Sequence, residues 1–158
     1  MVKNVFRRIV VVILSAFLWI FFKPILTRLG YKTLRIGHCT FMAPGKQLEV
    51  IARGTDRLHG LDPDLFSKLA SQKGLIFWYH KQKLIQAKRI ISITDDWLVW
   101  GADGVATFLA ESLIGLEYRE SRDYDFDVSA AVVRDRLCNW VAKHQINPEL
   151  KAQYASRP

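Results

Sequence analysis

The chain opens with a long apolar stretch, Ile9-Val-Val-Val-Ile-Leu-Ser-Ala-Phe-Leu-Trp-Ile-Phe-Phe22, in which Ser15 is the only polar residue. No polar face appears at helical spacing, so the stretch differs from an amphipathic core helix. As a helix, residues 9–22 span only about 21 Å. Continuing to Leu26, with the Lys23 ammonium reaching the headgroups, gives about 27 Å, close to a hydrocarbon core of about 30 Å. The stretch predicts a single-pass membrane anchor over residues 9–26.

Two alternatives to an uncleaved anchor stay open at this point. Lys3, Arg7 and Arg8 precede the stretch as the basic region of a signal peptide would. The residues after Phe22, however, contain no small-residue cleavage site of the A-x-A type. A re-entrant insertion into one leaflet is the second alternative, and an uncleaved signal-anchor is the favoured interpretation.

The positive charge of the protein is concentrated around this stretch. The net charge is +8, yet residues 1–48 contain no Asp or Glu, and residues 49–158 contain equal numbers of acidic and basic residues. Nucleic-acid binding would need the basic residues on the globular domain, so this distribution argues against it. It favours attachment to a bilayer with anionic lipids. The residues expected at the membrane surface are Lys23, Arg28, Lys32 and Arg35.

Membrane orientation and the redox state of the cysteines each have two interpretations. Basic residues lie on both sides of the anchor, and the longer basic stretch after it weakly favours a domain on the cytoplasmic face of the cell membrane. Cys39 and Cys138 can form a disulfide in an oxidising compartment or remain as two thiols in a reducing one.

The remaining residues suffice for one domain with its own core. We expect a basic tail over 1–8, the anchor over 9–26, a basic connector over 27–35, an α+β domain over 36–146 and a C-terminal tail over 147–158.

The first half of the domain contains clear local signals. Residues 47–52 are expected to form a strand and residues 55–60 a loop. Asp62-Pro63-Asp64 predicts a helix start, with Asp62 as the N-cap and Pro63 at the first helical position. Gly74 is suited to end this helix.

The central region reads as a series of strands joined by short connections, which predicts an antiparallel β-meander. Asp103-Gly104 is a strong hairpin signal. The alternative for residues 105–116 is a helix. The predicted strands cover residues 75–80, 84–94, 97–101, 105–111 and 114–121.

The last predicted element is an amphipathic helix over residues 129–144, expected to lie across the sheet. Its apolar residues recur at helical spacing. Large core side chains are expected at Leu69, Phe77, Trp97, Leu116, Leu137 and Trp140.

Catalytic chemistry has weak support in the sequence. Cys39 is the best candidate nucleophile and His59, in a loop with Arg53, Asp56 and Arg57, the best candidate acid or base. No zinc-ligand spacing, phosphate-binding loop or nucleophile elbow is present, so no metal site and no cofactor is predicted. A membrane-bound hydrolase or transferase using Cys39 or His59 is the second hypothesis for function.

Residues 65–94 contain several basic residues and no acidic ones. This run can pair with acidic neighbours inside the domain, or it can face a protein partner or lipid headgroups. The first hypothesis for function is a non-catalytic accessory or interaction subunit of a membrane complex, with a membrane-protein partner, and the third is a lipid-headgroup-binding module. The candidate partner or headgroup face comprises Lys81, Lys83, Lys88 and Arg89.

Overall fold

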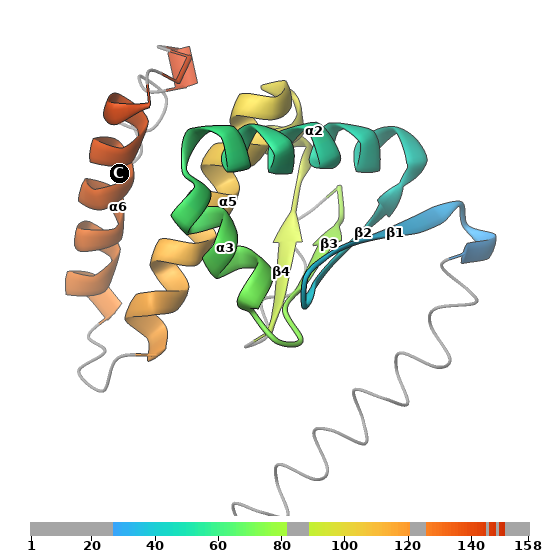
Figure 1. The fold of residues 1–158 in the computed structure, drawn as a ribbon, viewed down its shortest axis with the longest axis horizontal. Coiled ribbons are helices and arrows are strands. Elements are labelled where there is room, and N and C mark those ends of the chain that lie inside the picture. The colour runs from blue at the N-terminus through green and yellow to red at the C-terminus, as the bar shows by residue number, and fades with distance from the viewer. Residues whose placement is uncertain (1–26, 82–88, 121–125, 145, 148, 151–158) are drawn as a thin grey trace, which may run out of the picture.

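In this computed structural model, the described residues are 27–81, 89–120, 126–144, 146–147 and 149–150. Within them the protein is α+β, with a four-stranded mixed sheet and five helices (Figure 1). The predicted anchor over residues 9–26 lies outside the described residues. None of the helices in the described part of the chain is both long enough and apolar enough to cross a membrane.

The sheet has the order β1-β2-β3-β4. β1 (Tyr31–Ile36) and β2 (Cys39–Pro44) form an antiparallel hairpin, whose turn places Gly37 at φ 57°. β3 (Ile76–Tyr79) pairs parallel with β2, and β4 (Ile90–Ile93) pairs parallel with β3. The expected antiparallel meander is therefore wrong, because β2 and β3 are joined by two helices, and a helical crossover allows parallel pairing.

Helix α2 (Gly45–Leu61) occupies residues that were expected to form a strand and a loop. Those predictions are wrong because Gly54 and Thr55, which resemble loop residues in the sequence, are buried inside the helix. A Cβ at position 54 would collide with Val105, so glycine allows α2 to approach a second helix closely. The Thr55 hydroxyl donates to the Ala52 carbonyl, 2.7 Å away, and so satisfies its own hydrogen bond within the helix.

Helix α3 (Pro63–Ser71) begins as predicted. The Asp62 carboxylate accepts a hydrogen bond from the Leu65 backbone N–H at 3.0 Å, and Pro63 is the first helical residue. Leu65 and Leu69 are buried, so the apolar face of this helix also lies where its spacing indicated. These signals succeeded because capping depends on residues within one helical turn.

Helices α4 (Asp95–Leu98) and α5 (Gly101–Glu120) replace three expected strands. The helical alternative for residues 105–116 is confirmed, and the Asp103-Gly104 hairpin is wrong. All residues from Gly104 to Ala110 are buried, so α5 lacks the exposed stripe that would have revealed helical periodicity. Gly104 packs against Trp97 and Trp100, where a Cβ would collide.

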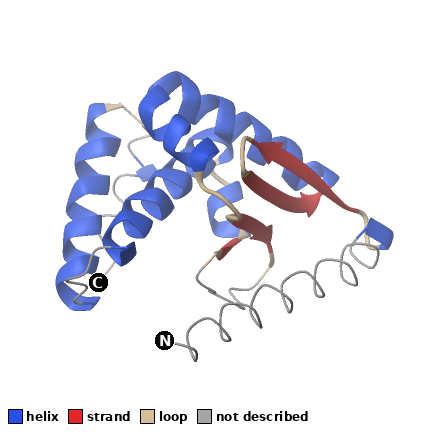
Figure 2. Cartoon of the chain, turned by 60° about the horizontal axis from the view of Figure 1, so that its bottom comes forward, coloured by secondary structure: helices blue, strands red, loops and turns tan. Residues whose placement is uncertain are grey.

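Helix α6 (Phe126–Lys143) confirms the predicted C-terminal helix and extends its start. It packs on α5 and not across the sheet, as Figures 1 and 2 show. Its position follows from α5, which already covers the sheet and offers a second apolar side. Ile146 and Leu150, beyond the end of α6, are also buried.

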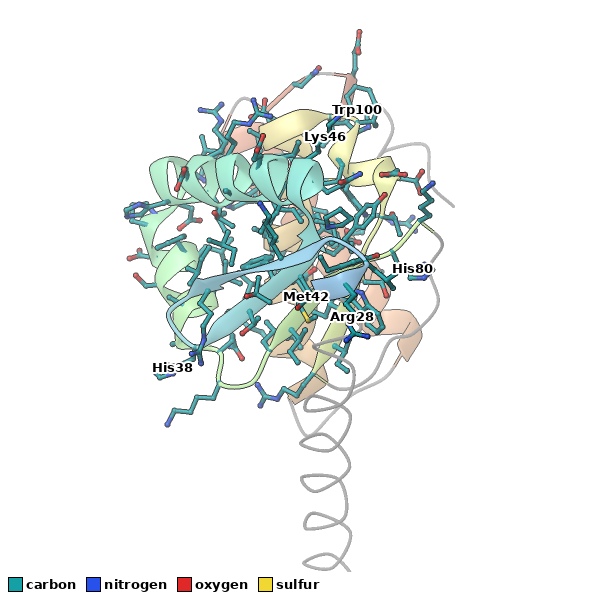
Figure 3. All side chains as sticks on the ribbon, turned by 90° about the vertical axis from the view of Figure 1, so that its right-hand side faces the viewer. Arg28, His38, Met42, Lys46, His80 and Trp100 are labelled. Atoms are coloured by element: carbon teal, nitrogen blue, oxygen red, sulfur yellow. The ribbon has the colours of Figure 1, made fainter. Side chains whose placement is uncertain are left out.

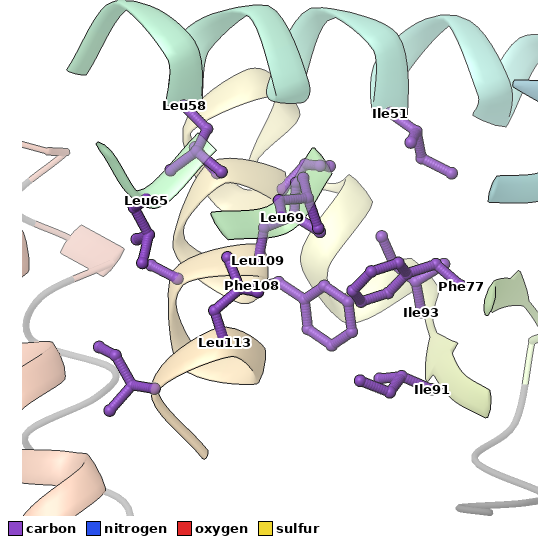
Figure 4. Close-up of a cluster of buried hydrophobic side chains, with 14 of the residues drawn as sticks. Ile51, Leu58, Leu65, Leu69, Phe77, Ile91, Ile93, Phe108, Leu109 and Leu113 are labelled. Carbon is purple, nitrogen blue, oxygen red and sulfur yellow. The ribbon is translucent and has the colours of Figure 1, made fainter. Parts of the chain in front are cut away.

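One hydrophobic core joins these layers (Figure 4). The Phe77 ring stacks on Phe41, with centroids 4.9 Å apart, and meets Phe108 of α5 edge-on at 5.9 Å. Of the predicted core residues, Trp97 is partly buried and the others are buried, namely Leu69, Phe77, Leu116, Leu137 and Trp140.

Candidate functional site: the open face of the sheet and its basic rim

Successive residues of a strand point to opposite sides of a sheet, and the two sides of this sheet differ. The covered face packs into the core beneath α2 and α5 (Figures 1 and 4). It comprises Leu34, Ile36, Cys39, Phe41, Ala43, Phe77, Tyr79, Ile91 and Ile93. The opposite side, here called the open face, comprises Thr33, Arg35, Thr40, Met42, Ile76, Trp78, Ile90 and Ser92.

Strand register arranges the open face in two rows. One row runs Thr33, Met42, Trp78 and Ser92, and the next runs Arg35, Thr40, Ile76 and Ile90. Within the described chain, Met42, Ile76, Trp78 and Ile90 do not belong to the core cluster. Met42 is 4% exposed, whereas Ile76, Trp78 and Ile90 are partly exposed. The centre of this side is apolar and largely covered, because Met42 is buried and the Trp78 Nε1 atom is buried without a hydrogen-bond partner in the described chain.

Three of the residues predicted at the membrane surface are exposed in the structure. Arg28 precedes β1, and Arg35 lies on the open face of β1. Lys32 pairs with Ala43 and therefore lies on the other side of β1, and Lys23 is outside the described residues. Figure 3 looks toward the sheet and shows Arg28 and His80 on one side of Met42 and His38 on the other. Leu29, beside Arg28, is an exposed large apolar residue at 67%.

Two residues of the predicted partner or headgroup face are also at the ends of these strands. Lys81 follows β3 and is exposed, and Arg89 precedes β4. The register brings Lys81 to the end of the sheet where Lys32 lies, and Arg89 to the end where Arg35 lies. Lys83 and Lys88 lie outside the described residues. The predicted membrane-surface cations and the predicted partner or headgroup cations are separate in the sequence, but their described members border one sheet.

The predicted nucleophile, Cys39, lies on the side of the sheet that packs into the core, where no substrate can reach it. Cys39 is fully buried on the covered face, and burial raises the pKa of its thiol to about 12. A thiol with this pKa stays protonated at neutral pH and is a poor nucleophile. The structure contains Cys39 and Cys138 as free cysteines.

His59 lies in the last turn of α2, on a different element from Cys39. Its ring is exposed and stacks on Phe66, with centroids 4.4 Å apart. The neighbouring Arg57 side chain donates to the Asp103 carboxylate at 2.8 Å. The group that looked like a reactive loop is thus part of a helix, with one member in an ion pair. Within the described residues no cluster of three or more His, Cys, Asp or Glu side chains can hold a metal ion.

A polar centre that the sequence did not reveal joins α6 to the α2–α3 junction. The Asp62 carboxylate accepts a hydrogen bond from the Trp140 indole N–H at 2.9 Å, in addition to capping α3. The His144 Nε2 atom lies 3.9 Å from the same carboxylate, and its ring packs on Trp140 with centroids 4.9 Å apart. Asp62 and Trp140 are 78 residues apart, so no local pattern signals their contact.

The surroundings shift the pKa values of both titratable groups in this centre, Asp62 and His144. Burial tends to raise the pKa of Asp62, but its hydrogen bonds from Leu65 and Trp140 and the nearby His144 and Lys143 lower it overall. Burial lowers the pKa of His144, Lys143 and Arg57 lower it further, and Asp62 opposes them. The His144 Nε2 atom is buried with no hydrogen-bond partner in the described chain. The neutral imidazole is therefore the favoured form.

A second polar cluster lies at the end of β3. The Tyr79 hydroxyl donates to Asp95 at 2.8 Å, and the Tyr31 hydroxyl donates to the Tyr79 carbonyl at 3.4 Å. Burial, followed by the Asp95 carboxylate, raises the pKa of Tyr79 to about 12. This cluster links the start of β1 and the start of α4 to the end of β3.

Comparison with protein-family models, with curated proteins and with solved structures gives no match.

Proposed function

We propose that this protein is a membrane-anchored, non-catalytic accessory subunit, which presents its α+β domain to a membrane-protein partner. The carrying observation is that exposed cations continue directly from the apolar stretch into the first strand of the domain. Arg28, Lys32 and Arg35 are all exposed and follow residues 9–26 within a few residues. The proposal joins a segment suited to a bilayer with a domain whose entry is suited to an anionic surface.

The charge at this entry is large enough to matter. A Lys or Arg near an anionic leaflet contributes about 1 kcal/mol, so three contribute about 3 kcal/mol at low salt. Screening acts over about 8 Å at physiological ionic strength, so the contribution depends on the cations lying close to the surface. Their direct connection to the anchor is what keeps them close in this proposal.

The competing hypothesis, a hydrolase or transferase using Cys39 or His59, has less support. It would require the Cys39 thiol to reach a substrate and to ionise, and burial opposes both. His59 is accessible, but its ring is stacked on an aromatic side chain at the end of α2. The non-catalytic proposal requires neither Cys39 nor His59 to take part in a reaction.

The test starts with membranes from cells that express the full chain. We expect the protein to remain in the membrane pellet after carbonate extraction, and a stoichiometric membrane protein to co-purify with it in mild detergent. Cys39→Ala and His59→Ala variants should recover the same partner in the same amount. Release by carbonate would disprove the anchor, and an active protein without a partner would favour the enzyme hypothesis.

A further inference from the structure

We propose that β1 accepts an additional strand along its outer edge, namely an extended acidic segment of the partner protein. The segment would continue the sheet through backbone hydrogen bonds and place carboxylates opposite Lys32 and Arg35. This inference rests on the proposed function, because it names the surface that the accessory subunit would offer to its partner. It goes further by assigning the mode of binding and the chemistry of the segment that is bound.

β1 is an edge strand of the described sheet. The strand order is β1-β2-β3-β4, so β2 is the single neighbour of β1 among the described strands (Figure 1). An edge strand presents a row of backbone N–H and C=O groups that can template pairing with another chain. β4 is the opposite edge, but it has four residues against six in β1, and residues 82–88 before it lie outside the described residues. β1 is therefore the longer and better defined edge.

The register identifies the backbone groups of β1 that point away from β2. The Thr40 N–H donates to the Leu75 carbonyl at 2.9 Å, so the backbone of Thr40 faces β3. Hydrogen-bonded and non-bonded pairs alternate along an antiparallel ladder, and the pair of Arg35 with Thr40 is therefore non-bonded. The same alternation makes the pair that contains Pro44 non-bonded, which suits a residue without a backbone N–H. The outer edge thus carries the backbone N–H and C=O groups of Tyr31, Thr33 and Arg35.

The side chains at this edge favour a segment that carries carboxylates. Lys32 and Arg35 are exposed and lie on opposite sides of β1. Residues 27–48, which include both strands of the hairpin, contain no Asp or Glu, so neither cation has an acidic neighbour within the hairpin. Carboxylates directly opposite these two side chains would form the opposite-charge pairs that stabilise neighbouring strands.

The start of α2 adds to the positive potential beside Lys32. α2 begins at Gly45, directly after β2, without a side-chain cap and without an acidic residue in its first turn. A Cβ at position 45 would lie 3.9 Å from the Lys32 Nζ atom, so an ammonium group lies beside the positive end of the helix dipole. These two positive groups repel each other, and a carboxylate on an added strand would offset the repulsion.

The same charges argue against pairing with a second copy of the chain. Two paired β1 strands would gather the Lys and Arg side chains of both copies, with no carboxylate in either strand. Like charges opposite each other destabilise neighbouring strands, and charged side chains on an edge protect it from self-association. A lipid surface or a nucleic acid would meet the cations but would leave the backbone groups of the edge without strand partners. An extended acidic peptide satisfies both requirements.

The spacing of the cations predicts the sequence pattern of the bound segment. An antiparallel addition, the slightly more stable pairing per residue, reads β1 in reverse. One carboxylate then faces Arg35, the next residue faces the partly buried Leu34 and should be apolar, and a second carboxylate faces Lys32. The predicted pattern is acidic-apolar-any-acidic, with the two carboxylates on opposite sides of the extended segment.

The test uses the full chain in nonionic detergent and a synthetic peptide with this pattern, acetyl-Thr-Val-Glu-Ile-Thr-Glu-Val-Thr-amide. Binding is followed by the NMR shifts of isotope-labelled backbone amides. The peptide should shift the amides of Thr33 and Arg35, whose N–H groups point outward. It should bind about tenfold more tightly than the same peptide with Gln in place of both Glu residues.

Two pairs of variants separate the contribution of charge from that of backbone pairing. Lys32→Gln with Arg35→Gln should abolish the preference for the Glu peptide, whereas Arg53→Gln with Lys73→Gln, at two exposed positions away from β1, should retain it. Thr33→Pro removes an outward N–H without removing a hydrogen bond of the hairpin, and it should weaken binding about tenfold. Thr33→Val, which keeps the N–H, should bind like the unaltered chain.

Hydrogen exchange gives a second measure of backbone pairing that needs no proline variant. The amides of Thr33 and Arg35 should exchange rapidly in the unbound chain and slowly in the peptide complex. The Leu34 amide, which points toward β2, should already exchange slowly before the peptide is added. Unchanged exchange of Thr33 and Arg35 in the complex would overturn the pairing along β1.

The remaining outcomes separate this inference from the proposed function. Equal binding of the Glu and Gln peptides, in a chain that resists carbonate extraction and co-purifies with a partner, would overturn the acidic segment and leave the accessory role intact. Peptide binding at β1 in a chain without a partner in membranes would retain the edge and overturn the accessory role. Loss of both would overturn both proposals. Dimers of the chain that Thr33→Pro dissociates would overturn the acidic segment in favour of a second copy.

Discussion

Along β3 and β4, neighbouring side chains on the same strand lie in two different environments. On the covered face, Phe77 is fully buried between Phe41 and Phe108, and the buried core residues of the described chain include no charged side chain. On the open face, Trp78 is partly exposed, and Lys73 and Lys81 lie beyond the two ends of its strand. The covered face is specified by packing within the chain. The open face combines the buried Met42 and the partly exposed Trp78 with cations at the strand ends, and it does not belong to the core cluster.

The largest predicted effect compares these two neighbours directly. Phe77→Ala should destabilise the protein by about 3–5 kcal/mol, because it leaves a cavity in a filled core. Trp78→Ala should cost about 1–3 kcal/mol, because the Trp78 side chain is partly exposed although its Nε1 atom is buried. Urea unfolding of the full chain in nonionic detergent, followed by circular dichroism, measures both. Equal losses would show that the open face is as important for folding as the covered face.

A second pair of substitutions tests how tightly the helices close over the covered face. Gly54→Ala should cost about 1–3 kcal/mol, because its Cβ would collide with Val105 where α2 crosses α5. Gly60→Ala, in the same helix with open space around it, should be neutral or stabilise by up to about 1 kcal/mol. The same unfolding assay applies. A stable Gly54→Ala variant would mean that the helical layer shifts easily.

The third prediction assigns a pH dependence to the helical side. The folded-state pKa of His144 is lowered, so the unfolded chain binds a proton more readily, and stability should fall as pH drops below about 6.5. Above that pH the contribution of this residue is fully present. His144→Gln should therefore lose less stability than the unaltered chain between pH 7.5 and 5.5. Identical losses in both would contradict the buried neutral imidazole.

The smallest predicted effect concerns the thiol beneath the sheet. Cys39→Ala should cost about 1 kcal/mol, because it removes one buried sulfur atom. In the folded protein an uncharged maleimide should modify Cys138 alone, and after unfolding it should modify both thiols. Rapid modification of Cys39 in the folded state would mean that the sheet opens toward its covered side.

The sequence predicted elements whose signals are local. Asp62 and Pro63 marked the start of α3 because a cap and its helix are adjacent in the chain. The sequence favoured strands over helix α5, with a helix as the alternative for residues 105–116, because residues 104–110 are all buried and lack a polar stripe. Strand β1 was missed because its exposed basic residues resembled a connector, although Leu34 and Ile36 alternate toward the core.

The sequence predicted which residues are surface cations, but it did not predict how they are arranged around the sheet. Counting charges identified Arg28, Lys32, Arg35, Lys81 and Arg89 as surface cations. Their arrangement around one sheet depends on the parallel pairing of β2 with β3 and of β3 with β4, which joins residues far apart in the chain. The contact between Asp62 and Trp140 is of the same kind, since it arises when α6 packs beside the α2–α3 junction.

The position of β1 as both the first and an edge strand has a mechanical consequence. Any tension along the chain from residues 1–26 reaches the domain at Tyr31, the first residue of β1. Its partner in the ladder is Pro44, which has no backbone N–H to donate. Force at this end would open the hairpin one rung at a time and not shear all its hydrogen bonds together. The hydrogen bond from Tyr31 to the Tyr79 carbonyl is the first restraint against such peeling. Under load, β1 should detach as a compliant tether before the core of the domain yields.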